Sequence, residues 1–199
     1  MKNVIIFGAT GHTGLYIVRK LMKYENLNLT LFVRNESKLK DINLENINVI
    51  KGDALNESDV ERALDNMDIL VCSLEGDVLT MAQNITKSLK NKKIRKIIWL
   101  TGMGIHHEIK GIRGLMLNMY AKKRPEYIEA ADLIAASDVN VTLLRCPQIV
   151  DGDNPKYYLT KEGVQPSKRS LQRQGIAECV FDLISDENLG CNESLGITS

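Results

Sequence analysis

Three glycines recur at three-residue intervals in the stretch FGATGHTG, which directly follows the apolar run NVII near the start of the chain. A glycine-rich turn between a strand and a helix leaves the first backbone N–H groups of the helix, and its partial positive charge, open to a phosphate. In that arrangement Gly8 permits the tight turn, Gly11 the close approach of a pyrophosphate, and Gly14 the packing of helix on strand. The pattern predicts a dinucleotide site; the alternative is a glycine turn that holds no ligand.

Polar side chains within the turn fit the same chemistry. Thr10 and Thr13 can add hydroxyl donors for a phosphate, and His12 can approach the adenosine phosphate. A histidine in a turn needs no function, so its role stays open.

Arg34 indicates which dinucleotide the turn would hold. It ends the second apolar run, 20 residues after Gly14, where a carboxylate would bind the ribose 2′-hydroxyl of NAD and an arginine would accommodate the 2′-phosphate of NADP. No acid competes at this position, and Lys38 adds a second positive charge one helical turn later. The alternative is that Arg34 and Lys38 are two solvated surface side chains that bind no phosphate. The sequence therefore favours NADP (NADPH) over NAD.

The elements that must position these residues alternate along the chain. Short β-branched runs predict strands at 3–7, 28–33, 48–52, 68–73, 96–101, 139–145 and, more weakly, 194–198. Helical periodicity predicts helices at 13–24, 57–66, 78–92, 125–137 and 173–185, the second of them capped by Asn56 or Ser58. Near-continuous apolar strands are typical of a parallel sheet buried on both faces. We expect an α/β fold, a three-layer doubly wound parallel sheet in a single domain, residues 1–199.

Two segments interrupt the alternation. Residues 102–118 hold four glycines and several apolar side chains without clean periodicity, and residues 147–168 hold three of the four prolines. Both follow strands at the carboxyl edge, where open α/β sheets bind ligands, so we expect them on the substrate side. The first segment could form a pliable apolar wall or pack on its own core; the wall residues would be Met103, Ile105, Ile109, Ile112, Met116 and Met119.

Composition excludes several classes of protein. Lys and Arg total 26 and Asp and Glu 25, so the net charge of +1 gives no electrostatic footprint for nucleic acid or an anionic membrane. No apolar run approaches the roughly 18 residues of a membrane span, and the apolar patch at the start of the chain is too short for a signal peptide. We expect a cytoplasmic protein with a small-molecule partner.

Neither the cysteines nor the histidines indicate a metal site. Cys72, Cys146, Cys179 and Cys191 form no C-x-x-C pair, and three of them sit in apolar surroundings, as reduced buried thiols do. His106 and His107 are adjacent, which rarely lets both bind one metal, and only Glu108 offers a third ligand. We expect no bound metal.

The glycine turn and the segments after it resemble one protein superfamily. GATGHTG is similar to the cofactor turn of the extended and atypical short-chain dehydrogenase/reductases, NAD(P)-binding Rossmann proteins, and within them to the NmrA-like and biliverdin/flavin reductase-like group. The resemblance continues through LFVRNESKL, IKGDALNESDVERAL, VCSLEGD, VNVTLLRCPQI and LQRQGIAECVFDLI. These motifs are specific for the family and not for a substrate.

The resemblance implies further cofactor contacts. Residues bordering the adenine would be Asp53 and Ala54; those lining the middle of the cofactor would be Ser73, Leu74 and Glu75; those near the nicotinamide would be Thr101, Cys146 and Pro147. Asp53 has an alternative role as a turn-forming residue after Gly52.

The Tyr-x-x-x-Lys pair that many members of the superfamily use has no convincing match. Tyr16 and Lys20 have the spacing but lie in the first predicted helix, behind the glycine turn. Tyr120 is followed by Arg124, which is not equivalent to lysine and precedes a proline, and Tyr127 is followed by Ala131. Thr101 and Tyr120 remain the candidate catalytic residues; Thr101 ends its predicted strand and is followed by Gly102, so a single hydroxyl is present there.

Two functions fit these observations. One is an NADPH-dependent oxidoreductase that transfers hydride to a flat aromatic, flavin- or quinone-like acceptor and mainly positions it, with the proton coming from solvent. The other is a non-catalytic NADP(H)-binding redox-sensing regulator of the NmrA-like kind, with a protein partner. A sugar-nucleotide epimerase ranks third, because the chain is short for the usual C-terminal substrate domain.

Overall fold

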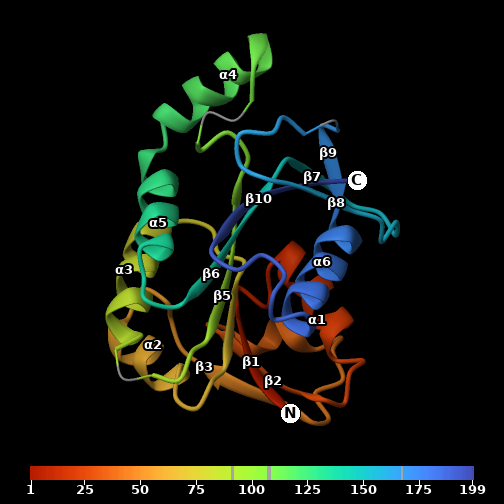
Figure 1. Ribbon diagram of the computed structural model, residues 1–199. Helices are drawn as coiled ribbons and strands as arrows, with labels where there is room; N and C mark the ends of the chain where they lie inside the picture. The colour runs from red at the N-terminus through yellow and green to blue at the C-terminus, as the bar shows by residue number, and fades with distance from the viewer. Residues whose placement is uncertain (91, 107–108, 167) are drawn as a thin grey trace.

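A mostly parallel sheet forms the middle layer of the protein (Figure 1). The computed structural model describes residues 1–90, 92–106, 109–166 and 168–199, and for Arg113, Asn118 and Tyr120 the backbone alone. The order across the main sheet is β3 (Ile47–Lys51), β2 (Leu27–Val33), β1 (Lys2–Phe7), β4 (Ile69–Cys72), β5 (Lys96–Gly102), β6 (Asn140–Cys146), β10 (Glu193–Thr198) and β8 (Tyr158–Thr160). Only β8 runs antiparallel among the described strands of this sheet. A small parallel pair, β7 (Gln148–Val150) with β9 (Ser170–Gln172), stands apart.

Helices cover both faces of the sheet (Figure 1). On one face lie α1 (His12–Leu21) and α6 (Arg173–Ser185); on the other lie α2 (Glu57–Ala63), α3 (Val78–Ser88) and α5 (Pro125–Ala135). A 3-10 turn, η1 (Glu36–Leu39), follows β2, and α4 (Gly111–Lys122) extends beyond the sheet. The three-layer doubly wound architecture predicted from the sequence is confirmed, and each predicted strand agrees with the observed one to within one residue at either end.

Alternating side chains of each strand bury the two faces separately. Val4 and Ile6 of β1 pack in the core under α1 and α6, whereas Ile5 and Phe7 pack in the core under α2, α3 and α5. Phe7 stacks on Phe32 of β2 with ring centroids 4.2 Å apart. All of these side chains are fully or almost fully buried, which is why the strands read as continuous apolar runs.

Local sequence signals set where helices begin. The Asn56 side-chain oxygen accepts hydrogen bonds from the backbone N–H groups of Ser58 (3.0 Å) and Asp59 (3.3 Å), so Asn56 rather than Ser58 caps α2. Pro125 occupies the first turn of α5, where its missing N–H costs nothing. No described helix is long and apolar enough to span a bilayer.

The segment 102–118 contains a helix that the sequence pattern did not predict. Helix α4 begins inside it, and apolar residues surround the helix axis, so no one-sided period of 3.6 was visible. Leu117 and Ala121 face inward, while the side chains exposed by more than half are Ile112, Leu115, Met116 and Met119. The predicted apolar wall was therefore wrong for Ile112, Met116 and Met119. The segment 147–168 likewise contains β7 and β8, which were not predicted.

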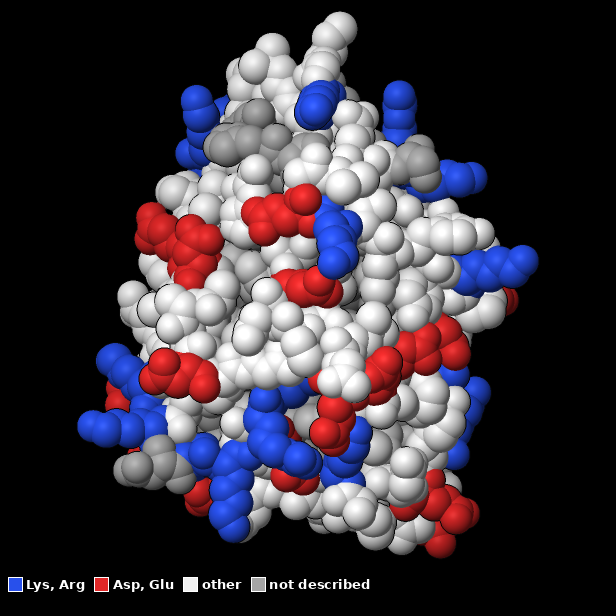
Figure 2. All heavy atoms as spheres, viewed as in Figure 1, with Lys and Arg blue, Asp and Glu red and all other residues white. Residues whose placement is uncertain are grey.

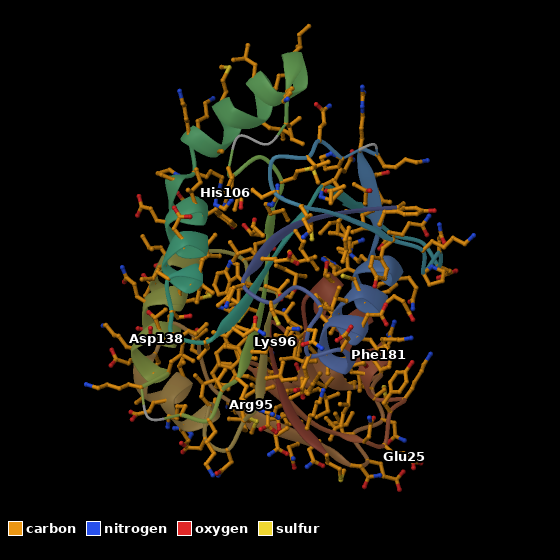
Figure 3. All side chains as sticks on the ribbon, in the orientation of Figure 1. Glu25, Arg95, Lys96, His106, Asp138 and Phe181 are labelled. Carbon is orange, nitrogen blue, oxygen red and sulfur yellow. The ribbon has the colours of Figure 1, made fainter. Side chains whose placement is uncertain are left out.

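A buried lysine secures the C-terminal end of α6. Lys96, at the start of β5 and 4% exposed, donates from Nζ to the carbonyl oxygens of Leu183 and Leu189, both at 2.7 Å (Figure 3). Lys2 donates to the carbonyl of the adjoining Ile184 at 2.8 Å. Burial lowers the pKa of Lys96, while the nearby carboxylates of Asp186 and Glu187 oppose that shift. These ammonium groups satisfy helix carbonyls that would otherwise lack partners.

Replacing this lysine tests the arrangement. Lys96→Met keeps the aliphatic stem but removes the donor from one buried and one part-buried carbonyl, so we expect the free energy of unfolding to fall by about 2–3 kcal/mol. Urea denaturation measures the change. Lys93→Met, at an exposed neighbouring position, should stay within about 0.5 kcal/mol of the native value. Equal midpoints for all three proteins would contradict a stabilising role for Lys96.

Candidate functional site

A cavity of about 450 Å³ opens at the carboxyl edge of the sheet. The chain reverses its order across the sheet between β1 and β4, and the cavity is lined by residues that follow these strands and β5 and β6. Such a switch point is where open α/β sheets bind ligands. The predicted residues that line it are Gly11, His12, Thr13, Ser73, Leu74, Glu75, Thr101, Cys146 and Pro147.

Two of the three glycines are required by backbone crowding. Gly8 has φ of +80°, and a Cβ there would lie 2.0 Å from the carbonyl oxygen of Ser73. A Cβ at Gly14 would lie 2.0 Å from the carbonyl oxygen of Gly8. Neither backbone atom can move aside, because both belong to the junction of β1, β4 and α1. These two glycines hold the turn in shape.

Gly11 has a different role, since the space beside it is much less crowded than at Gly8 and Gly14. A Cβ at Gly11 would meet only the Gly8 carbonyl oxygen, at 3.3 Å. Gly11 is the N-cap of α1, where no side chain accepts from the helix N–H groups, and it faces the cavity together with His12 and Thr13. This uncapped helix N-terminus fits an anion such as a pyrophosphate.

Arg34 and Lys38 lie outside the cavity wall, at the same edge. Arg34 follows β2 directly, and the parallel register that pairs Phe7 with Phe32 brings it beside the glycine turn. Lys38 belongs to η1, which Asn35 caps by accepting from the N–H of Ser37 at 2.9 Å. Both basic side chains are exposed, and within the described ranges neither forms an ion pair. Their contact with a 2′-phosphate stays a prediction.

Asp53 forms the turn after β3. Its Oδ1 accepts from the N–H of Leu55 at 3.0 Å, and its own N–H donates to Asp59 at 3.0 Å. That backbone hydrogen bond, with the neighbouring Arg62, holds the pKa of Asp59 below its usual value. Ala54 is buried, and its carbonyl accepts from Asn84 at 3.0 Å. The turn-forming role of Asp53 is thus observed, while the expected contact of Asp53 and Ala54 with adenine stays a prediction.

The far end of the cavity holds a hydroxyl without a partner. Thr101, at the end of β5, is 8% exposed, and its Oγ1 has no hydrogen-bond partner among the described residues. Since buried polar groups are nearly always paired, this hydroxyl is available to a ligand. Cys146, in register with Gly102 on the neighbouring strand, and the next residue, Pro147, line the same cavity. Burial raises the pKa of the Cys146 thiol to about 12, so the group stays protonated and is no nucleophile at neutral pH.

The structure adds three residues that sequence reasoning missed. Arg124, Tyr127 and Arg173 line the cavity. The Arg124 guanidinium donates to the Tyr127 hydroxyl at 2.9 Å and lies 4.2 Å from the centre of its ring, while Arg173 pairs with Asp151. Pro125 was the sequence signal for Arg124 and Tyr127. It starts a helix, so Arg124 is the N-cap residue and Tyr127 lies in the first turn.

Other chemical candidates are not brought to the cavity. The Lys20 ammonium binds Glu178 of α6 at 2.7 Å, so the Tyr16–Lys20 match serves helix packing. His106 contacts Asp132 (3.2 Å) and Glu162 (3.0 Å) below α4 (Figure 3). The Tyr120 side chain, and His107 and Glu108, lie outside the described residues. No metal-binding group of three or more ligands occurs in the described part of the chain.

The surface drawn in Figure 2 carries both signs of charge. Red and blue side chains are interspersed among larger white areas, and blue and white spheres lie at the outer end around α4.

A doubly wound sheet with a crowded glycine turn at its switch point defines an NAD(P)-binding Rossmann protein. The chain belongs to the NAD(P)H-binding family, which its sequence matches over residues 8–187. The predicted NAD(P)-binding Rossmann family is confirmed, while membership in the atypical short-chain dehydrogenase/reductase group stays a prediction.

Solved structures agree over the whole chain. A Rossmann-fold NAD(P)-binding family protein from Shigella flexneri is 26% identical, with a TM-score of 0.83, over 100% of this chain and 94% of that one. A short-chain dehydrogenase/reductase from Veillonella parvula in complex with NADP is 24% identical, with a TM-score of 0.86 and the same coverage. ChuY, an anaerobilin reductase from Escherichia coli O157:H7, is 15% identical, with a TM-score of 0.79, over 99% of this chain and 97% of that one. No curated protein matches the sequence.

The two kinds of glycine should respond differently to one methyl group. The methyl of Gly11→Ala meets one backbone oxygen at 3.3 Å, so we expect only a small fall in melting temperature. We expect at least tenfold weaker NADPH binding, because the methyl occupies the space that the pyrophosphate needs. Gly14→Ala forces two backbones apart, and we expect it to lower the melting temperature markedly. Thermal unfolding and fluorescence titration with NADPH separate the two effects. Native NADPH affinity in Gly11→Ala would show that the turn does not hold the cofactor.

Proposed function

We propose that the protein is an NADPH-dependent reductase whose acceptor is a flat aromatic compound of the flavin or quinone class. The observation that carries the proposal is the buried, unpartnered Thr101 hydroxyl at the end of a cavity that begins at the glycine turn. A ligand that extends from the turn to Thr101 must be elongated, anionic at one end and hydrogen-bonding at the other, as a dinucleotide is.

The residues present fit this cofactor. Gly11 and Thr13 would hold the pyrophosphate, Arg34 and Lys38 the 2′-phosphate, and Thr101 the nicotinamide end. When bound there, NADPH supplies a hydride. His12 and the turn at Asp53 would flank the adenosine half.

Part of the cavity wall has the apolar character that an aromatic acceptor requires. Apolar side chains from the loop after β5 and from α4, Met103, Ile105 and Leu117, line its outer part. These groups exclude water and present flat or flexible surfaces to an aromatic ring, which is the positioning that hydride transfer requires.

An acceptor panel tests the proposed activity. We expect NADPH oxidation, followed at 340 nm, to exceed the rate without protein for at least one flavin, quinone or linear tetrapyrrole. NADPH oxidation by Gly11→Ala should fall to the rate without protein. This variant is therefore the matched control for contaminating reductases. NADP(H) binding without turnover of any acceptor would instead favour the redox-sensing regulator that the sequence left open.

The choice of cofactor rests on Arg34 and is tested separately. Arg34→Ala removes a charge-assisted contact to the 2′-phosphate, so NADPH affinity should fall by about 1.5–3 kcal/mol while NADH affinity changes little. Titration calorimetry measures both. Arg19→Ala, an exposed arginine near the other end of α1, should leave both affinities unchanged. Equal losses for NADPH and NADH would mean that Arg34 does not bind the phosphate.

A further inference from the structure

Arg124 and Tyr127 form a side-chain pair in the wall of the cavity. Arg124 is the N-cap of α5, Pro125 fixes the first turn, and Tyr127 follows with its backbone N–H donating to the Arg124 carbonyl at 3.2 Å. The Arg124 Nη2 donates to the Tyr127 hydroxyl at 2.9 Å, with the guanidinium carbon 4.2 Å from the ring centre. Both side chains line the same cavity as Thr101.

The direction of this hydrogen bond leaves the phenolic proton unused. A guanidinium is only a donor, so the Tyr127 oxygen accepts from Arg124 and its own proton remains available to a ligand. This hydrogen bond and the position of the guanidinium over the ring together hold the Tyr127 hydroxyl in place. Glu126 accepts from the Arg124 Nε at 3.4 Å, which fixes the guanidinium and moderates its charge.

Tyr157 shows the opposite arrangement. Its hydroxyl donates to the carboxylate of Asp182, so its proton is already bound. Burial and this carboxylate together raise the pKa of Tyr157 far above the usual value. Where Tyr157 has a negative partner, Tyr127 has a positive one.

We propose that Tyr127 is the proton donor to the acceptor and that Arg124 positions and stabilises it, an inference that rests on the proposed reductase function. The acceptor gains a hydride at one atom, and the phenolic O–H bond breaks to deliver its proton to a carbonyl oxygen or ring nitrogen of the acceptor. The phenolate then takes a proton from water through the open cavity. In sum, NADPH, a proton and the acceptor give NADP⁺ and the doubly reduced acceptor.

Alternative donors within the cavity are less suited to this step. The Cys146 thiol has its pKa raised to about 12 and is buried. The Thr101 hydroxyl is a much weaker acid than a phenol, and its proposed role is to orient the nicotinamide end of the cofactor. His12 lies at the glycine turn, at the other end from Thr101.

The test compares Tyr127→Phe with Tyr158→Phe, which alters an exposed tyrosine outside the cavity. With the acceptor that the panel identifies, Tyr127→Phe should lower kcat by about 10²–10⁴-fold, with KM for NADPH and the melting temperature unchanged. Added imidazole at constant pH should partly restore the Tyr127→Phe rate, because it supplies a proton donor. Tyr158→Phe should match the native protein throughout.

Two further measurements, one of binding and one of turnover in Arg124 variants, test the inference. Lumiflavin binding to the NADP⁺ complex, followed by flavin fluorescence, should weaken about 3–10-fold in Tyr127→Phe, as the loss of one hydrogen bond predicts. Arg124→Met keeps the phenol but removes its cation, and should lower kcat at least tenfold, whereas Arg124→Lys should recover part of the loss.

The possible failures differ. A native kcat in Tyr127→Phe, with native lumiflavin affinity, overturns the role of Tyr127 and leaves the reductase in place. A fall in kcat that imidazole does not relieve, accompanied by a lower melting temperature, shows a structural role and also overturns it. Absence of NADPH oxidation by the native protein with every acceptor overturns the proposed function itself and this inference with it.

Discussion

The close approach of three backbone segments at the glycine turn constrains the rest of the site. The carbonyl oxygen of Ser73, after β4, lies where a Cβ of Gly8 would be, and the carbonyl oxygen of Gly8 lies where a Cβ of Gly14 would be. Strand β1, the end of β4 and the first turn of α1 are therefore packed without intervening side chains. This packing aims the N-terminus of α1 into the cavity, and it fixes the distance from that positive helix end to the ends of β5 and β6. A cofactor would be oriented by main-chain atoms that cannot rotate.

The strands and most helices could be predicted from the sequence because their signals are local. Runs such as those around Ile6 and Val71 are apolar on both faces, and only a covered parallel sheet buries both. The cap at Asn56 is equally local. Helix α4 could not be predicted, because Leu117 faces the cavity while Met116 and Met119 face solvent, and a helix apolar on opposite sides has no one-sided period. The antiparallel β8 pairs with β10 through residues far apart in the chain, which no window of sequence contains.

The residues of the candidate site also divide into those that the sequence could predict and those that it could not. The geometry of the glycine turn follows from its own residues, and resemblance to a family led to Thr101 and Cys146. Asp53 fitted two roles, and the hydrogen bond to Leu55 shows one of them. The pair of Arg124 and Tyr127 was missed because the expected spacing places a cation four residues after a tyrosine. Here the cation precedes the tyrosine by three residues, and the two meet only because α5 begins between them.

That placement has a physical consequence for the chemistry. At a helix N-terminus the N-cap side chain lies beside the first turn, so a residue there can reach the side chain three positions later without being helical itself. A long, planar guanidinium at this position can both donate to a phenol oxygen and lie over its ring, which a lysine ammonium on the next turn cannot do to the same extent. Glu126 accepts a hydrogen bond from the Arg124 Nε, and this contact helps to keep the guanidinium at the cavity wall. The start of α5 thus places a phenol, hydrogen-bonded to a guanidinium, in the wall of the cavity that Thr101 also lines. In such a site proton delivery depends on where a helix begins rather than on a fixed sequence spacing.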